Sequence, residues 1–287
     1  MKGGSTGVLV GCGALFGSTF VLIRFAVPSF GPVAVTAVRA LLGGALLLAV
    51  AWRRHDLPRL GDWRGFAVLG LLSAALPFSL LALASVTLNA GTVSVLNTSS
   101  VPIALVIEAV RRRHAPGARQ IAGVLLATAG VVVVMSTKNL SLDGPGAFAG
   151  VVAAVAGAGI FAYGGFYAAD RFAKTGPVAL AAGQQIAAFA LLAPAVLVLP
   201  PAGPFPPLVL GAAVLVGVLG SGVAYLLFYW LIDREGPARA ANVNLLVPGF
   251  GVGWGAVLLG EDVTRVAFAG MAVTLAGLVL VLRRPEG

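Results

Sequence analysis

Apolar runs of about 20 residues follow one another along almost the whole chain. An α-helix of about 20 apolar residues is long enough to cross the hydrocarbon core of a bilayer. Of the 287 residues, 59% are hydrophobic and only 10% are charged, a composition that is too apolar for a water-soluble domain. The chain is therefore predicted to be an all-α integral membrane protein that is surrounded by a lipid bilayer.

Ten transmembrane helices are predicted, because the apolar runs are separated by links that contain charged residues, glycine or proline. Very short links, such as the one at 28–32, force neighbouring helices to run antiparallel. The expected helices span residues 7–27, 31–51, 64–84, 90–110, 117–137, 147–168, 176–199, 208–231, 240–259 and 266–282.

Basic residues are concentrated in alternate links, which orients the predicted helices in the membrane. If the N-terminus is cytoplasmic, fifteen Lys and Arg residues lie on the cytoplasmic side and two, Lys138 and Arg265, lie on the other side. Cytoplasmic loops carry an excess of Lys and Arg, so both termini are expected in the cytoplasm, and the chain in a bacterial inner membrane. Topology thus explains the net charge of +9, and no nucleic-acid partner is expected.

Internal repetition is the second constraint on the fold. The sequence Gly-Pro-Val-Ala occurs at 31–34 and again at 176–179, which is a shift of 145. Pro102 recurs as Pro248 with a shift of 146. These shifts predict a duplicated chain in which each copy contributes five helices.

The two copies are expected at 1–138 and 147–287, joined by a periplasmic linker at 139–146. Because five is an odd number, the second copy enters the membrane from the opposite side. This arrangement is the inverted-topology duplication of secondary transporters, which bind their substrates between the halves near the membrane midplane.

Three prolines are expected to break predicted helices, namely Pro77, Pro102 and Pro248. A proline inside a helix removes one backbone donor and frees the carbonyl four residues before it. In a bilayer, such a carbonyl is tolerated only where protein or water satisfies it. The carbonyls freed by Pro102 and Pro248, which are expected to face a cavity, belong to Thr98 and Asn244, and Ser73 precedes Pro77 by four residues.

Neutral polar and aromatic side chains in the predicted helices are the candidate substrate contacts. Tyr225 shares one helix face with Ser221 and Tyr229, because residues four apart lie on the same side. Interhelical hydrogen bonding is the alternative role for these groups, and the ring of Trp254 is expected either to close the cavity or to face lipid. The candidates are Ser79, Asn97, Thr98, Tyr163, Tyr225, Asn242, Asn244 and Trp254.

Arg24 and Arg39 are the ionisable residues expected inside the membrane, where charge is costly and usually functional. Arg24 is expected either to extend to the interface or to guide an anionic substrate group. Arg39 is expected to be a structural charge that packs against backbone carbonyls.

Carboxylates are expected only at helix ends and in links. Glu108 is expected to pair with Arg112, and Asp170 with Arg171 or Lys174. Proton-coupled pumps use chains of Asp, Glu or His inside the membrane, so this distribution favours facilitated diffusion over proton coupling.

The last two predicted helices carry a family pattern. The region 240–277 combines a small-residue start, a mid-helix proline, a Gly-Glu pair and regularly spaced glycines in the last helix. Together with Phe-Gly-Ser-Thr-Phe at 16–20, and with Pro32 before Arg39, it resembles the EamA-type branch of the drug/metabolite transporter superfamily. The resemblance covers essentially the whole chain. It implies two inverted five-helix repeats around a central cavity, and within the family it is greatest to bacterial amino-acid exporters, including those for aromatic amino acids.

The first half departs from this pattern at Ala115, which stands where the Gly-Glu turn should recur. Glu261 is therefore expected to cap a loop, as a structural charge. Small multidrug antiporters of the superfamily bind cations with a carboxylate in their first helix, and this chain has none there. The resemblance thus disfavours cationic drugs as substrates.

These observations predict an exporter of small zwitterionic metabolites, above all amino acids with large apolar or aromatic side chains, that works by alternating access. A carrier of nucleotide sugars or lipid-linked sugars on the same fold is the main alternative, and a channel or a membrane-embedded enzyme are others. No catalytic residue, metal or cofactor is expected, since Cys12, His55 and His114 do not converge. The expected assembly is a monomer or a weak homodimer.

Overall fold

The computed structural model describes residues 3–88, 90–136, 146–201, 203–260 and 263–282. Within these ranges, the side chains of some helical residues, among them Arg24, lie outside the description. The predicted linker apart from Gly146, and also Glu261, lie outside the described residues. The elements in the described ranges are all helices.

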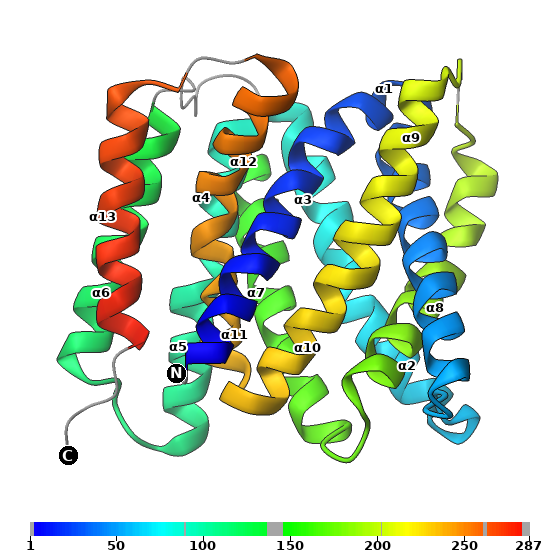
Figure 1. The fold of residues 1–287 in the computed structure, drawn as a ribbon, viewed down its shortest axis with the longest axis horizontal. Helices are drawn as coiled ribbons and strands as arrows, with labels where there is room; N and C mark the ends of the chain where they lie inside the picture. The colour runs from blue at the N-terminus through cyan, green and yellow to red at the C-terminus, as the bar shows by residue number, and fades with distance from the viewer. Residues whose placement is uncertain (1–2, 89, 137–145, 202, 261–262, 283–287) are drawn as a thin grey trace.

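The first helical stretch, α1 (Gly3–Arg53), contains two of the predicted transmembrane helices. They meet at Gly31, whose backbone is not helical and has a φ of 71°. Glycine adopts a positive φ at little cost because it lacks a Cβ atom, and the following Pro32 has no N–H group to continue the ladder. The link predicted at 28–32 is therefore a sharp bend at Gly31 that separates two helices of α1 (Figure 1).

The remaining elements follow in chain order. The first half continues with η1 (Leu60–Asp62), α2 (Trp63–Gly70), the π-helical η2 (Leu71–Ala75), α3 (Leu76–Thr87), α4 (Ala90–Asn97), α5 (Ser100–Arg112) and α6 (Ala118–Ser136). The second half comprises α7 (Ala147–Arg171), α8 (Pro177–Val198), α9 (Pro207–Leu215), the π-helical η3 (Val216–Val223), α10 (Ala224–Glu235), α11 (Pro237–Ala241), α12 (Val243–Leu259) and α13 (Arg265–Leu282).

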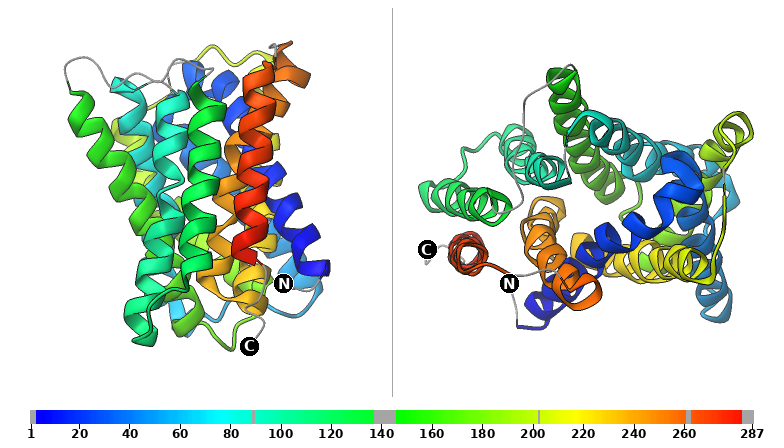
Figure 2. Two further views of the ribbon diagram at one scale, coloured as in Figure 1. Left: turned by 90° about the vertical axis from the view of Figure 1, so that its left-hand side faces the viewer. Right: turned by 90° about the horizontal axis from the view of Figure 1, so that it is seen from above.

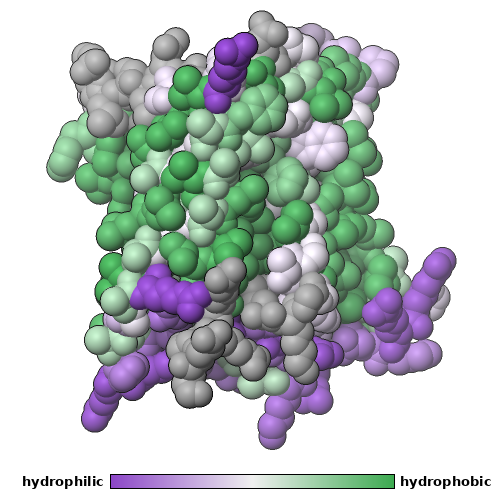
Figure 3. All heavy atoms as spheres, turned by 60° about the vertical axis from the view of Figure 1, so that its left-hand side comes forward, coloured by the Kyte–Doolittle hydropathy of each residue, from purple (hydrophilic) through white to green (hydrophobic). Residues whose placement is uncertain are grey.

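Eight helical stretches among the described residues are long and apolar enough to cross a membrane, and Ala118–Val134 is a shorter apolar helix. The helices run between two opposite ends of the molecule, and α1 begins at the same end at which α13 finishes (Figure 1, Figure 2). Hydrophilic side chains gather at that end, whereas the surface between the two ends is hydrophobic (Figure 3). We call it the basic end, because α1, α5, α7 and α10 finish there with Arg53, Arg111, Arg112, Arg171 and Arg234.

The tightest contact between the halves joins α6 and α13, which run antiparallel side by side (Figure 1). A Cβ atom on Gly123 would lie 2.8 Å from the carbonyl oxygen of Gly277, and one on Gly130 would lie 2.7 Å from that of Gly270. Gly123 and Gly270 are 147 residues apart, and so are Gly130 and Gly277. The two contacts are therefore equivalent under the internal repeat. Small residues allow membrane helices to approach closely and gain dispersion contacts, so these glycines fix the pairing of α6 with α13.

The two π-helical segments also occupy equivalent places in the two halves. Adding 145 to the bounds of η2 gives 216–220, which falls inside η3. For η2 the physical cause is Pro77, which lies just after it and cannot donate to the preceding turn. π-Helical turns often mark functional sites, and both of these face the centre of the bundle, where Ser73 and Ser221 are buried.

Candidate functional site

Polar residues of α5 and α12 meet in the interior of the protein. The predicted helix at 90–110 is interrupted at Thr98 and Ser99, just before Pro102. The carbonyl of Thr98 accepts from the N–H of Val101 at 3.0 Å, as the first bond of a tighter turn. Next to this break, the side-chain amide of Asn244 donates a 2.8 Å hydrogen bond to the hydroxyl of Ser100.

Both partners of this bond are buried, with 6% of Asn244 and none of Ser100 exposed. Asn244 precedes Pro248 by four residues and Ser100 precedes Pro102 by two, so the contact joins the proline-containing segments of the two halves. A polar crossing of this kind between helices provides hydrogen-bonding groups where lipid provides none.

Asn242 lies at the start of α12 and is 2% exposed. Its Nδ2 atom donates to the carbonyl of Arg239 at 3.0 Å. Its Oδ1 atom is buried and accepts no hydrogen bond from the described residues, and the same holds for the hydroxyl of Ser99. A buried acceptor without a donor costs about 1–3 kcal/mol, so a ligand that supplies a donor there would gain free energy.

A second polar group surrounds the π-helical segments. The hydroxyl of Tyr225 donates to the carbonyl of Ser73 at 2.6 Å, which is the carbonyl freed by Pro77. The Nε atom of Arg39, in α1, donates to the hydroxyl of Ser221, in η3, at 2.7 Å. The amide of Gln185 donates to the carbonyl of Ser221 at 2.6 Å.

Arg39 is 4% exposed, and its guanidinium carbon lies 4.4 Å from the centre of the Phe78 ring. None of the ion pairs formed among the described residues includes Arg39. The sequence-based prediction that it packs against backbone carbonyls is wrong in its detail, because its bonded partner is the Ser221 side chain and an aromatic ring covers its face. A cation without a nearby carboxylate inside a membrane protein is a candidate anion-binding group.

Aromatic rings fill the space between α1, α7 and α10. The ring centres of Phe16 and Tyr225 are 5.5 Å apart in an edge-to-face pair, and those of Phe161 and Phe228 are 5.4 Å apart. All four rings are buried. These buried rings therefore pack against one another between α1, α7 and α10.

The side chains of the other candidate residues bond elsewhere or are partly exposed. Ser79 donates to the carbonyl of Ala75 in its own helical stretch, and Thr98 to that of Val95. Asn97 is partly exposed at the end of α4. The indole N–H of Trp254 donates to the carbonyl of Ala14 at 2.9 Å, which ties α12 to α1.

Tyr163 lies on a different side of its helix from the centre of the bundle. It is 51% exposed and shares an exposed face of α7 with Val152. Gly165, two residues later and so nearly opposite on the helix, packs against Ile232 and Pro237. Tyr163 is therefore largely exposed on α7, and the side chain of Arg24 lies outside the description.

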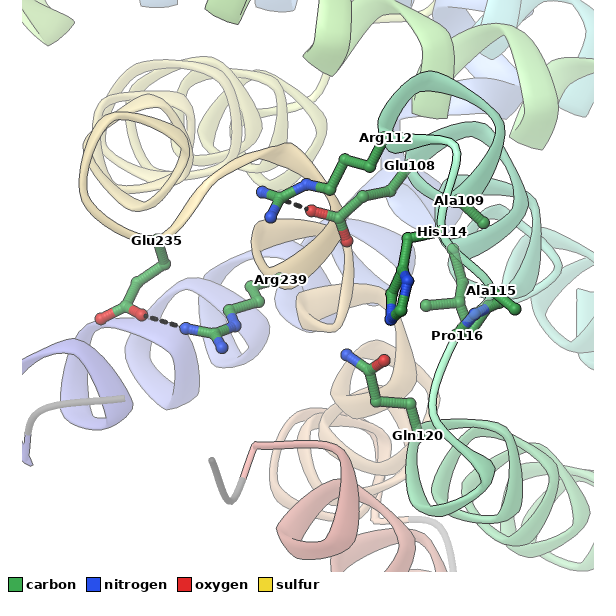
Figure 4. A pocket seen from close by; sticks show the side chains of 10 residues that line it. Glu108, Ala109, Arg112, His114, Ala115, Pro116, Gln120, Glu235 and Arg239 are labelled. Atoms are coloured by element: carbon green, nitrogen blue, oxygen red, sulfur yellow. Dashed lines mark hydrogen bonds and ion pairs between the residues drawn. The ribbon is translucent and has the colours of Figure 1, made fainter. Parts of the chain in front are cut away.

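A pocket of about 290 Å³ opens at the basic end, between the α5–α6 link and the α10–α11 link (Figure 4). Two ion pairs lie at it, Glu108 with Arg112 at 2.9 Å and Glu235 with Arg239 at 3.4 Å. The lining residues are Leu105, Glu108, Ala109, Arg112, His114, Ala115, Pro116, Gln120, Glu235 and Arg239.

Ion pairing at this end confirms one prediction and corrects another. Glu108 pairs with Arg112 as predicted. Asp170, however, pairs with Arg111 of α5, and Arg171 pairs with Asp62. Adjacent residues on a helix point in different directions, which separates Asp170 from Arg171.

The pocket itself was missed by reasoning from the sequence, although the pair Glu235 and Arg239 around Gly236-Pro237 was visible as a signal. Within the described residues, no group of three or more His, Cys, Asp or Glu side chains could hold a metal ion.

Comparison with known proteins agrees with a duplicated membrane transporter. The model of the EamA-like transporter family matches residues 5–136 and again residues 148–283. An uncharacterized protein of Pseudomonas aeruginosa is 32% identical over 260 residues, covering 87% of this chain and 84% of that protein. The uncharacterized inner membrane transporter YedA of Escherichia coli is 27% identical, covering 96% of this chain and 89% of that protein.

An uncharacterized transporter of Archaeoglobus fulgidus is 23% identical over 286 residues, covering 94% of this chain and 95% of that protein. A protein of known crystal structure has the same fold, with a TM-score of 0.82 and 19% identity, covering 96% of this chain and 98% of that chain. Because the family model matches nearly the entire length in two copies, the chain is a multi-pass membrane transporter that belongs to the EamA-like transporter family.

Proposed function

We propose that this transporter exports small zwitterionic metabolites, above all amino acids with large apolar or aromatic side chains, across the bacterial inner membrane by facilitated diffusion. The observation that carries the proposal is the chemistry of the interior. Amides, hydroxyls and the buried Arg39 adjoin aromatic rings, and none of the described ion pairs includes this arginine. Such a lining supplies a partner for each part of an aromatic amino acid.

The proposed topology has ten crossings in two inverted halves, 1–138 and 147–287, with both termini in the cytoplasm. α4 and α5 together form the interrupted fourth crossing, and α6 forms the fifth. Support comes from the antiparallel pairing of α6 with α13, in which a shift of 147 converts one glycine contact into the other. An inverted repeat requires equivalent helices to run in opposite directions.

Each end of the substrate has a candidate partner. Arg39 keeps its planar guanidinium group against Phe78 and can offer its terminal nitrogens to a carboxylate, the geometry that makes arginine suited to this role. The Oδ1 atom of Asn242 can accept from the ammonium group. Aromatic contacts contribute about 0.5–1.5 kcal/mol each beyond area burial, enough for broad selection among large side chains but not for strict choice of one.

Facilitated diffusion follows from where the carboxylates lie. The ten Asp and Glu residues of the sequence fall in links or at helix ends, whereas proton relays require ionisable groups inside the membrane. Alternating access is the proposed mechanism because buried aromatic rings pack between α1, α7 and α10, so the halves must move apart to admit a substrate among them.

The test is uptake of labelled phenylalanine and tryptophan by proteoliposomes that contain the purified protein. We expect saturable flux without an imposed pH gradient, and competition by other large neutral amino acids. Flux that requires a proton gradient would refute the mechanism. Flux of organic cations alone, or of nucleotide sugars alone, would refute the substrate class.

A further inference from the structure

We propose that the pocket at the basic end is a loading site that binds both charged ends of a zwitterion before it enters the centre. This inference rests on the proposed function and adds a separate site to it. The pocket carries two carboxylates, from Glu108 and Glu235, and two guanidinium groups, from Arg112 and Arg239. One pair comes from α5, and the other spans the α10–α11 link (Figure 4).

The balance of these four charges favours a ligand that is itself neutral overall. A zwitterion can place its carboxylate on a guanidinium group and its ammonium on a carboxylate, so that every charge keeps a partner. A simple anion or cation leaves one pocket charge without a partner. The pocket thus selects for two opposite charges on one small molecule.

The existing ion pairs can open at little cost. The side chain of Arg112 is 74% exposed and that of Arg239 is 33% exposed, and ion pairs within reach of solvent contribute little net free energy. The carboxylates are held more firmly, since the side chains of Glu108 and Glu235 are 23% and 8% exposed. A ligand therefore meets guanidinium groups that are more exposed than the carboxylates they pair with.

The inner side of the pocket adjoins the polar centre. The carbonyl of Arg239 accepts a hydrogen bond from Asn242, whose Oδ1 atom has no donor among the described residues. On the facing helix, Leu105 lines the pocket five residues after Ser100, which is about 7 to 8 Å along a helix axis. A ligand in the pocket is thus about two helical turns or less from the Asn244–Ser100 contact.

The size of the pocket limits what it can bind. Its volume is about 290 Å³, which is at the lower limit of the roughly 300–1,000 Å³ typical of pockets for drug-sized ligands. An amino acid is small enough for this space. A nucleotide sugar or a lipid-linked sugar is a larger, anionic molecule and matches neither the volume nor the charges.

The duplicated fold does not create this pocket by itself. The shift of 146 that relates Pro102 to Pro248 relates Glu108 to Trp254 and Arg112 to Leu258. At the opposite end, therefore, an indole bonded to the carbonyl of Ala14 takes the place of the carboxylate. Among the described residues, the positions equivalent to Glu108 and Arg112 carry no charged pair, as expected for a site on one face of the membrane.

The experiment uses an Ala115→Cys variant, which places a thiol in the lining of the pocket; the native Cys12 is fully buried. The rate at which a membrane-impermeant maleimide labels this thiol is measured in the purified protein with phenylalanine, leucine or serine added. Two analogues of phenylalanine are compared, phenethylamine without the carboxylate and 3-phenylpropionate without the ammonium. We expect the amino acids to slow labelling, and each analogue to require at least a tenfold higher concentration for half-protection.

Two substitutions identify the contacts, and the chain offers a matched control for each. Arg112→Gln should raise the half-protecting concentration of phenylalanine and 3-phenylpropionate at least threefold but not that of phenethylamine. Glu108→Gln should raise the half-protecting concentration of phenylalanine and phenethylamine at least threefold but not that of 3-phenylpropionate. Arg111→Gln and Asp170→Asn remove the neighbouring ion pair, which does not line the pocket, and should leave all three values unchanged.

Thermal melting of each variant separates loss of binding from loss of fold, and the opposite ligand patterns of the two variants cannot result from unfolding. The proposal is overturned if no zwitterion protects the thiol, if the analogues protect as well as phenylalanine, or if the controls behave like the pocket variants. Saturable phenylalanine flux without protection of the thiol would support the proposed function and refute the loading site. Protection by serine without flux of large amino acids would support the loading site and refute the proposed function.

Discussion

The hydroxyl of Tyr225 donates a 2.6 Å hydrogen bond to the main-chain carbonyl of Ser73, which is 152 residues away in the other half of the chain. Pro77 deprives this carbonyl of its helical donor, and the π-helical turn of η2 presents it to the interior. A backbone carbonyl that lacks its helical donor in the first half thus accepts a hydrogen bond from a side chain of the second half. The bond couples the two halves at the level of the buried Arg39 and Ser221.

Replacing Tyr225 by Phe should destabilise the protein by about 0.6–2 kcal/mol, the range measured for interhelical hydrogen bonds in membranes. The ring and its contact with Phe16 are retained, so the loss reports the hydroxyl alone. Tyr163→Phe, on the exposed face of α7, is the control and should not change the melting temperature. Equal melting of the two variants would show that the Ser73 carbonyl is satisfied in another way.

Asn244→Leu should strongly reduce phenylalanine flux while changing stability by about 1 kcal/mol, because it removes one amide from a buried contact. Ser100→Ala breaks the same hydrogen bond but keeps the amide. If the amide contacts substrate, Asn244→Leu lowers flux much more than Ser100→Ala at a similar melting temperature. Identical flux in both variants would assign the amide to packing alone.

Arg39→Gln should reduce phenylalanine flux at least about tenfold, because a charged hydrogen bond to a carboxylate contributes about 1.5–3 kcal/mol. Gln184 is the matched control, since it stands 145 residues later at the equivalent position and is fully buried. Its amide has no hydrogen-bond partner among the described residues, so Gln184→Leu should leave flux within about twofold. Loss of flux in both variants would indicate damage to packing instead of a lost substrate contact.

Gly277→Ala should destabilise the pairing of α6 with α13 by about 1–3 kcal/mol, the usual cost of overpacking. Its Cβ atom would collide with the backbone of Ala127. Gly253→Ala is the control, because nothing lies within 4 Å of a Cβ atom there. Melting curves in detergent should separate the two variants, and a harmless Gly277→Ala would mean that the helices can move apart freely.

The proposed orientation predicts which engineered thiols are accessible from outside the cell. A cysteine at Phe205 should react with a membrane-impermeant reagent in intact spheroplasts, whereas one at Leu57 should react only after permeabilisation. The two residues lie in links at opposite ends of the bundle (Figure 1). The reverse pattern of labelling would invert the topology and place the loading pocket outside the cell.

Features that depend on short stretches of chain were predictable. Helix positions follow from the length of apolar runs, and the interruption before Pro102 follows from the donor that proline lacks. The prediction of two separate helices around 28–32 is confirmed, because the non-helical backbone of Gly31 separates the two helices of α1. The pairing of Glu108 with Arg112 was likewise local, as a contact between neighbouring turns of one helix.

The sequence by itself therefore determined a membrane protein of long helices, interrupted before Pro102 and basic at one end. The predicted break at Pro248 is wrong, because α12 continues through this proline. Only the tertiary structure decided that Tyr225 bonds to Ser73, that Asn244 bonds to Ser100 and that Asp170 takes Arg111 as its partner. Those contacts depend on how each helix is rotated about its axis. In a membrane protein both the lipid-facing and the buried side of a helix are apolar, so hydropathy does not reveal the rotation, and close packing of small residues sets it instead.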